Sequence, residues 1–230
     1  MVDHTSRAYE QELRKLKDRL LAMGGRCEQL ITQATRALGE LDADLAKKVE
    51  QTDRAINVEE VAIDESTVRI LALRQPVGRD LRFLVMALKV VTDLERIGDE
   101  AVNLAERAVE LSSAPPILPL QPQLHELAEA AAAMVRQALD SFVTEDVELA
   151  RTVLKADDHV DALYGQLIRA SMALVEQNPS RVQDGFRYAF CAKYLERVAD
   201  HATNIAEQVV FMVSGDDVRH LGSREAETKG

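Results

Sequence analysis

The chain is poor in aromatic residues and in cysteine. Tryptophan is absent, and aromatic side chains make up 4% of the 230 residues. The two cysteines, Cys27 and Cys191, are far apart and neither belongs to a CxxC pair. Closely paired cysteines mark disulfide frameworks and structural zinc sites, and their absence argues against both. We therefore expect two buried free thiols and a reducing, cytoplasmic location.

Long apolar runs and basic runs are also missing. The most apolar stretch, residues 83–91, is interrupted by Lys89, and no run approaches the ~18 residues of a membrane span. The first residues, MVDHTSRAYEQELRKLKDRLL, contain no apolar signal-peptide core. The chain has 28 basic and 39 acidic residues, a net charge of −11. This balance disfavours nucleic acid and membrane insertion, and it favours cationic ligands such as metal ions.

Strand signals are absent, and helical ones replace them. There is no sustained alternation of period two and no Asn-Gly or Asp-Gly hairpin turn. Apolar residues recur instead at steps of three and four. This spacing predicts six helices, over about 7–40, 42–74, 77–111, 122–143, 145–176 and 180–213. Asp42 or Asp44 is expected to cap the second, and Pro76 to lie in the first turn of the third.

Proline marks the division between two halves. Four of the six prolines lie in SSAPPILPLQPQ, residues 112–123, which we interpret as a linker. The halves cover residues 1–111 and 124–214, and a polar tail covers 215–230. Because short turns make consecutive helices neighbours, we predict an all-α fold of two tandem antiparallel three-helix bundles.

The two halves repeat each other. LERIGDEAVN, residues 94–103, returns as LERVADHATN, residues 195–204. When the chain is aligned with itself at an offset of 101 residues, nine of the 18 positions in 92–109 are identical to those in 193–210. Matching acids also lie in the preceding helices, Asp53 in the first half and Asp157 in the second. The repeat therefore covers whole three-helix units and indicates a tandem duplication.

Each copy carries Glu-x-x-x-Asp, which puts two carboxylates on one helix flank. Residues four apart, such as Glu95 and Asp99, are offset by about 40° and ~6 Å. Two charges at that distance repel by ~0.7 kcal/mol in water and by ~3 kcal/mol at an effective dielectric constant near 20. A bound cation relieves this repulsion, and oxygen ligands suit Mg²⁺, Ca²⁺ and Mn²⁺ and can hold iron.

A single pair of this kind is usually just solvated, and only the second copy, at Glu196 and Asp200, favours a cation site. Arg96 and Arg197 are expected to pair with surface acids. Other polar residues near the motifs leave their roles open: Asn103 and Asn204 are either second-layer groups or helix–helix hydrogen bonders, and His159 and His201 are expected to be incidental.

No catalytic signature is present. The chain has no Walker loop, GxSxG or HExxH, and its Glu-x-x-x-Asp differs from the Glu-x-x-His of di-iron carboxylate enzymes. We expect no catalytic residue and no site for an organic cofactor.

The sequence resembles the PhoU family of bacterial phosphate-transport accessory and regulatory proteins. The resemblance rests on VAIDESTVRILALRQPVGRDLR (61–82), on DLERIGDEAVNLA and YLERVADHATNIA, and on VSGDDVRHLG (213–222). It covers nearly the whole chain and implies two tandem three-helix bundles with multinuclear metal clusters at the acidic motifs. The implied ligands form two sets: Asp53, Asn57, Glu95 and Asp99, and Asp157, Asp161, Glu196 and Asp200.

The resemblance also implies a function and partners. Iron, zinc, manganese or magnesium is the expected divalent or trivalent metal. Because Asn57 stands opposite Asp161, the first set has one charge fewer and is expected to bind metal less tightly. The family's role is to repress the phosphate-starvation response by linking the phosphate ABC transporter, through its ATPase, to a sensor histidine kinase.

Three hypotheses remain open at this stage. The leading one is a cytoplasmic, homodimeric, metal-binding signalling adaptor without enzymatic activity. The second is a metal-dependent, carboxylate-bridged enzyme. The third is a purely structural helical protein whose acids form a solvated face.

Overall fold

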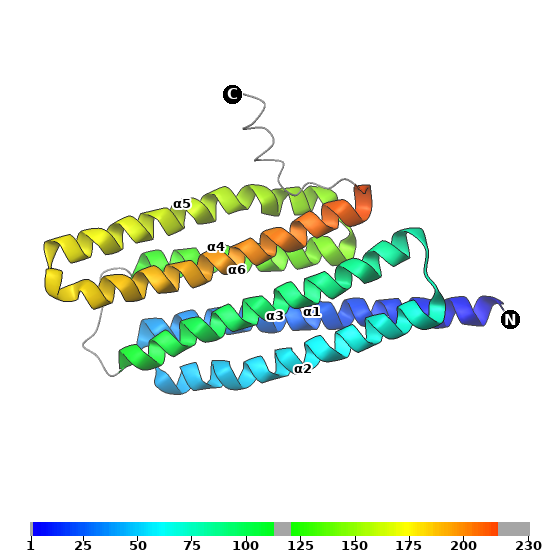
Figure 1. Cartoon of the computed structure of the whole chain (residues 1–230), viewed down its shortest axis with the longest axis horizontal. Helices are drawn as coiled ribbons and strands as arrows, with labels where there is room; N and C mark the ends of the chain where they lie inside the picture. Colours follow the sequence, from blue (N-terminus) through cyan, green and yellow to red (C-terminus); the bar gives the residue numbers. More distant parts are fainter. Residues whose placement is uncertain (1, 113–120, 216–230) are drawn as a thin grey trace, which may run out of the picture.

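The protein folds into six long helices, seen in a computed structural model that describes residues 2–112 and 121–215 (Figure 1). A short 3₁₀ helix, Pro179–Arg181, leads into the sixth, and no strand occurs in these two ranges. The α-helices are α1 Val2–Glu40, α2 Ala43–Arg74, α3 Gly78–Ser112, α4 Gln121–Thr144, α5 Val147–Gln177 and α6 Val182–Ser214. The predicted all-α fold of two tandem three-helix bundles is confirmed.

The helix boundaries agree with the sequence pattern to within a few residues, although α1 begins at Val2 and not near residue 7. Asp42 caps α2, and its side chain accepts hydrogen bonds from the backbone N–H groups of Asp44 and Leu45. Pro76, which we expected inside the third helix, precedes it, because α3 begins at Gly78. Of the predicted linker, residue 112 belongs to α3, residues 121–123 belong to α4, and residues 113–120 lie outside the described ranges, as does the tail from residue 216.

The turns of the two bundles are built alike. α1 and α2 are joined by Leu41 and Asp42, and α4 and α5 by Glu145 and Asp146, with a positive φ at the first residue of each pair. Asp146 then caps α5 by accepting from the Leu149 N–H, as Asp42 caps α2. The same turn chemistry therefore sets the antiparallel path of the chain in both halves.

The bundles lie against each other along their length, with α3 beside α6 and α1 beside α4 (Figure 1). Phe83 of α3 stacks on Phe142 of α4, with ring centroids 5.3 Å apart. Gly24 lets α1 approach α4 closely, because a Cβ there would meet Leu139. Cys27 and Cys191 are free and buried, as predicted. One continuous core therefore joins the two bundles.

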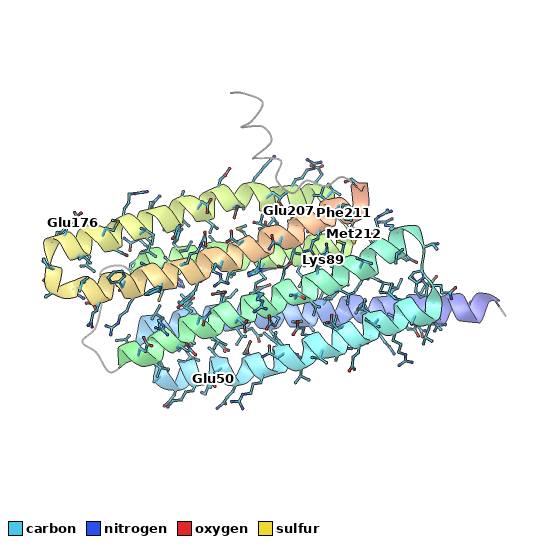
Figure 2. The ribbon with its side chains drawn as sticks, viewed as in Figure 1. Glu50, Lys89, Glu176, Glu207, Phe211 and Met212 are labelled. Atoms are coloured by element: carbon cyan, nitrogen blue, oxygen red, sulfur yellow. The ribbon has the colours of Figure 1, made fainter. Side chains whose placement is uncertain are left out.

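The bundles differ at their outer ends. α1 has 39 residues and runs past the turn between α2 and α3, whereas α4 has 24 residues and stops short of the turn between α5 and α6 (Figure 1). Among the residues that the structure describes, no third helix lies beside the α5–α6 end, where Glu176 lies (Figure 2). Its apolar side chains stay accessible, and Met172 and Phe186 are each 61% exposed.

Candidate metal centres

The first acidic cluster forms where α2 lies against α3. Asp53 of α2 is 8% exposed and faces Gly98 of α3, where a Cβ would come within 2.8 Å of the Asp53 Oδ1 atom. The side chain of Asn57 donates from Nδ2 to the other carboxylate oxygen of Asp53 at 3.2 Å. Gly98 thus provides the space that brings a carboxylate of α2 beside Glu95 and Asp99.

The electrostatics of this cluster disfavour its charged form. Burial raises the pKa of Asp53, and repulsion from Asp99 raises it further. Burial likewise raises the pKa of Glu95, with added repulsion from Asp99, Glu60 and Asp53. The carboxylates are therefore close enough to destabilise one another, which is the condition that a bound cation relieves.

Two further acids of α2, which neither the repeated motif nor the resemblance includes, extend the cluster. Glu60 and Asp64 continue the row of α2 that begins at Asp53 and Asn57, at steps of three and four. Burial raises the pKa of Glu60, which Asp64 and Asp99 raise further. The spacing alone could have revealed both residues. Glu60 adds a negative charge to the first cluster beside Asp99, and the weaker metal binding expected from Asn57 stays a prediction.

The second acidic cluster repeats this arrangement between α5 and α6. Burial raises the pKa of Asp157, and Asp161 and Asp200 add to the rise, while the hydroxyl of Thr203 lowers it. Burial also raises the pKa of Asp200, which Glu196 raises further. In each bundle the structure therefore makes neighbours of the four residues that the resemblance implies for the site, and their role as metal ligands stays a prediction.

Cations of the protein itself already contact both clusters. Arg96 contacts Glu95 at 3.4 Å and Asp99 at 3.2 Å, and Lys193 contacts Glu196. Arg96 thus pairs with acids, as predicted, but with those of the cluster. In the part of the chain that the structure describes, no three His, Cys, Asp or Glu side chains converge on one point as they would around an ion. A metal ion would have to displace these cations from the carboxylates.

The donor set nevertheless fits a hard metal ion. The Oδ1 atoms of Asp53 and Asp64 are buried and have no hydrogen-bond partner among the described residues. Such orphaned acceptors are costly, because they have lost water without gaining a donor. Carboxylate and amide oxygens are ligands that Mg²⁺, Mn²⁺ and Ca²⁺ accept. If a metal binds, Asp53, Glu95 and Asp99 would hold it in the first cluster, and Asp157, Glu196 and Asp200 in the second.

Polar residues near the motifs bind across the seam between α3 and α6. Arg197 pairs at 2.9 Å with Glu100, which is 2% exposed. Asp93 of α3 lies 3.0 Å from the Nδ1 atom of His201 and accepts hydrogen bonds from Asn204 and Gln208. Asn204 is therefore a helix–helix hydrogen bonder, one of the two roles expected for it, whereas His201, expected to be incidental, contacts the other bundle.

An open groove follows the same seam. It has a volume of about 460 Å³, and Lys89 of α3 and Glu207 and Phe211 of α6 lie along it (Figure 2). None of the helices in the described ranges has both the length and the apolar character that a bilayer span needs.

Two tandem three-helix bundles with paired acidic motifs place the chain among duplicated all-α bundle proteins. Comparison with known proteins identifies the family. The model of the PhoU domain matches residues 20–108 and again residues 124–209. The chain belongs to the PhoU family.

Curated relatives match over nearly the full length. The chain is 38% identical to the "Phosphate-specific transport system accessory protein PhoU homolog" of Pseudomonas putida, over 100% of this chain and 91% of that protein. It is 35% identical to the "Phosphate-specific transport system accessory protein PhoU" of Escherichia coli K12, over 96% and 92%. These names describe accessory proteins, not enzymes, in agreement with the prediction that the chain is not an enzyme.

Solved structures match the fold. The crystal structure of PhoU from Pseudomonas aeruginosa is 38% identical, with a TM-score of 0.86 over 90% of this chain and 100% of that one. The structure titled "phosphate transport system regulatory protein PhoU" from Streptococcus pneumoniae is 27% identical, with a TM-score of 0.83 over 91% and 99%.

Proposed function

We propose that this protein is a regulatory adaptor of phosphate uptake that represses the phosphate-starvation response. The full-length similarity to accessory proteins of phosphate-specific transport carries this proposal. In it, a homodimer in the cytoplasm contacts the ATPase of the phosphate ABC transporter and a sensor histidine kinase. In this proposal the protein acts by binding these partners and not by catalysis, because its relatives are named accessory proteins.

The metal-binding part of the proposal rests on the two acidic clusters. Each gathers carboxylates whose pKa is raised by burial and by mutual repulsion. An ion bound by two or three of them would replace the contacts that Arg96 and Lys193 make. Both side chains would then be released toward the surface. Metal binding would thereby change the charge of the surface offered to a partner.

Deletion of the gene tests the regulatory role. We expect a reporter of phosphate-starvation genes to be expressed at high phosphate in the deletion strain and to be silenced again by the wild-type protein. A reporter that stays silent in the deletion strain at high phosphate would contradict the adaptor function. Co-purification of the transporter ATPase and the kinase with the tagged wild-type protein tests the partners directly.

Variants of the clusters test whether metal binding serves this role. Glu95→Gln with Asp99→Asn removes two acids from the first cluster. Glu50→Gln with Glu106→Gln removes two exposed acids outside it and serves as the matched control. We expect the control to restore repression and the cluster variant to restore it only in part. If both variants are equally abundant in the cell and restore repression equally, the proposal that metal binding serves regulation would be contradicted.

A further inference from the structure

A basic pocket lies between α1 and α2, near the end of the first bundle where α1 runs past the α2–α3 turn. It has a volume of about 280 Å³, close to the lower end of the ~300–1,000 Å³ that small-molecule sites span. Lys15, Arg19, Ser66, Arg69 and one acid, Glu12, border it, and Leu16, Ile70 and Leu73 form its apolar floor. A concentration of cations is unexpected in a chain with a net charge of −11.

Two of the cations around the basic pocket are neutralised by local acids. Arg74 donates two hydrogen bonds to Glu12, at 2.9 and 2.8 Å. Arg19 donates to Glu59 at 2.6 Å and also contacts the Ser66 hydroxyl oxygen at 3.3 Å. The acids and the cations of these two pairs are therefore balanced within the protein.

The other two cations are not balanced. Lys15 and Arg69 are exposed, and neither forms an ion pair or a hydrogen bond with another residue in the described ranges. Their effect on the pocket appears at Glu12, whose pKa is lowered by its hydrogen bonds to Arg74 and further by the charges of Arg74, Arg69 and Lys15. The basic pocket thus presents an excess of two positive charges.

We propose that the basic pocket binds a small phosphate-bearing anion. A phosphate monoester carries −1.5 to −2 charges near neutral pH, which matches two free cations better than a single carboxylate does. The guanidinium of Arg69 offers paired donors to phosphoryl oxygens, and Lys15 adds a point charge. Any organic part of the ligand would lie on the apolar floor against Leu73, which is 67% exposed, because Leu16 and Ile70 are buried.

The described part of the second bundle lacks the polar and charged residues that border this pocket on α2. The repeat aligns Ser66 and Arg69 with Ala170 and Ala173, which carry no charge. The segment that would align with Lys15 precedes α4, which begins at Gln121. The anion site is thus specific to the first bundle. It is separate from the acidic clusters and does not depend on metal binding there.

Calorimetric titration of metal-stripped, full-length protein tests the proposal, with inorganic phosphate and AMP as separate probes. We expect Lys15→Ala with Arg69→Ala to weaken binding by about tenfold or more, because both charge-assisted contacts are lost. The matched control, Lys47→Ala with Lys48→Ala, removes the same charge about 30 Å away along α2 and should change binding by less than about twofold.

A third variant tests the charge balance in the opposite direction. Glu12→Gln releases Arg74 from its acid partner and should tighten binding severalfold. Tighter binding of AMP than of phosphate would mean that the apolar floor contributes, and equal binding would indicate a site for the phosphoryl group alone. Either result supports the proposal. No binding of either probe, or equal losses in both double variants, would overturn it.

Discussion

The two bundles share their turns and acidic clusters but differ in what covers their outer ends. α1, with 39 residues, covers the outer end of the first bundle and builds the basic pocket against α2. α4, with 24 residues, leaves the outer end of the second bundle uncovered. There, an apolar groove of about 320 Å³ opens between α5 and α6, lined by Met172, Val182 and Phe186. Helix length therefore decides which kind of surface each bundle presents.

A second difference lies within the clusters. The row of α2 continues from Asp53 to Glu60 and Asp64, whereas the repeat aligns these last two positions with Tyr164 and Ile168. The first cluster is thus a longer acidic row, and the second a compact one in which Lys193 also lies over the Tyr164 ring, 5.8 Å from its centroid. If both clusters bind ions, this difference in their acids predicts different ion preferences.

The largest expected effect concerns the core that joins the bundles. Phe142→Ala removes a fully buried ring that stacks on Phe83 and should lower the free energy of unfolding by about 3–5 kcal/mol. Phe186→Ala, at an exposed ring of the apolar groove, should change it by less than about 0.5 kcal/mol. Denaturant unfolding measures both. Because the core is continuous, the backbone amides of both α2 and α5 should exchange faster in Phe142→Ala than in the wild type. Faster exchange in α5 alone would show that the bundles unfold independently.

The next effect separates two arginines that the repeat makes equivalent. Arg197→Ala leaves Glu100 buried without its partner across the seam and should destabilise the protein by about 3 kcal/mol. Arg96→Ala breaks exposed contacts within the first cluster, so about 1 kcal/mol or less should be lost. Thermal unfolding of both variants decides the matter. Equal destabilisation would mean that the Glu100 contact does not hold the bundles together.

A smaller effect, the dependence of folding stability on pH, follows from the raised pKa of Asp53, Glu95, Asp157 and Asp200. Because these folded-state pKa values lie above the unfolded ones, the folded protein binds the protons more tightly. The resulting stability is fully present below the unfolded pKa values, near 4, and is lost as the pH rises through the folded ones.

Metal-free protein should therefore melt at a higher temperature near pH 5 than near pH 7. Asp53→Asn with Asp157→Asn should reduce that difference, since two of the titrating groups are gone. Differential scanning calorimetry at both pH values measures it. A melting temperature that falls on going from pH 7 to pH 5 in metal-free protein would contradict the assignment.

The smallest expected effect on stability concerns Gly98 and its equivalent, Ala199. Gly98→Ala gains helix propensity of about 1 kcal/mol, but its Cβ would press on the Asp53 carboxylate. The melting temperature should stay nearly constant while metal affinity at the first cluster falls. Ala199→Gly is the reciprocal change. Metal titration of both variants measures this, and unchanged affinity in Gly98→Ala would show that Asp53 is not a ligand.

Most of the fold was predictable, because helix period and turn chemistry are local properties. Asp42 and Asp146 stand where caps are needed, and the repeated motif located both clusters. The Glu100–Arg197 pair was not predictable, since it depends on the packing of α3 against α6. The uncovered end beside Phe186 depends on where α4 begins, and the linker residues before it gave no sharp boundary. Glu60 and Asp64 follow Asp53 and Asn57 at helical spacing, but the repeat that found Asp53 could not find them, because its second copy has Tyr164 and Ile168 at these positions.

The central claim, that the repeat builds two cation sites, is tested most directly by the metal content of the purified protein. Elemental analysis would compare the wild type with Glu95→Gln/Asp99→Asn, with Glu196→Gln/Asp200→Asn and with both pairs combined. We predict that each pair removes the metal of its own cluster and that the combined variant retains none. Equal metal content in the wild type and the combined variant would contradict the claim.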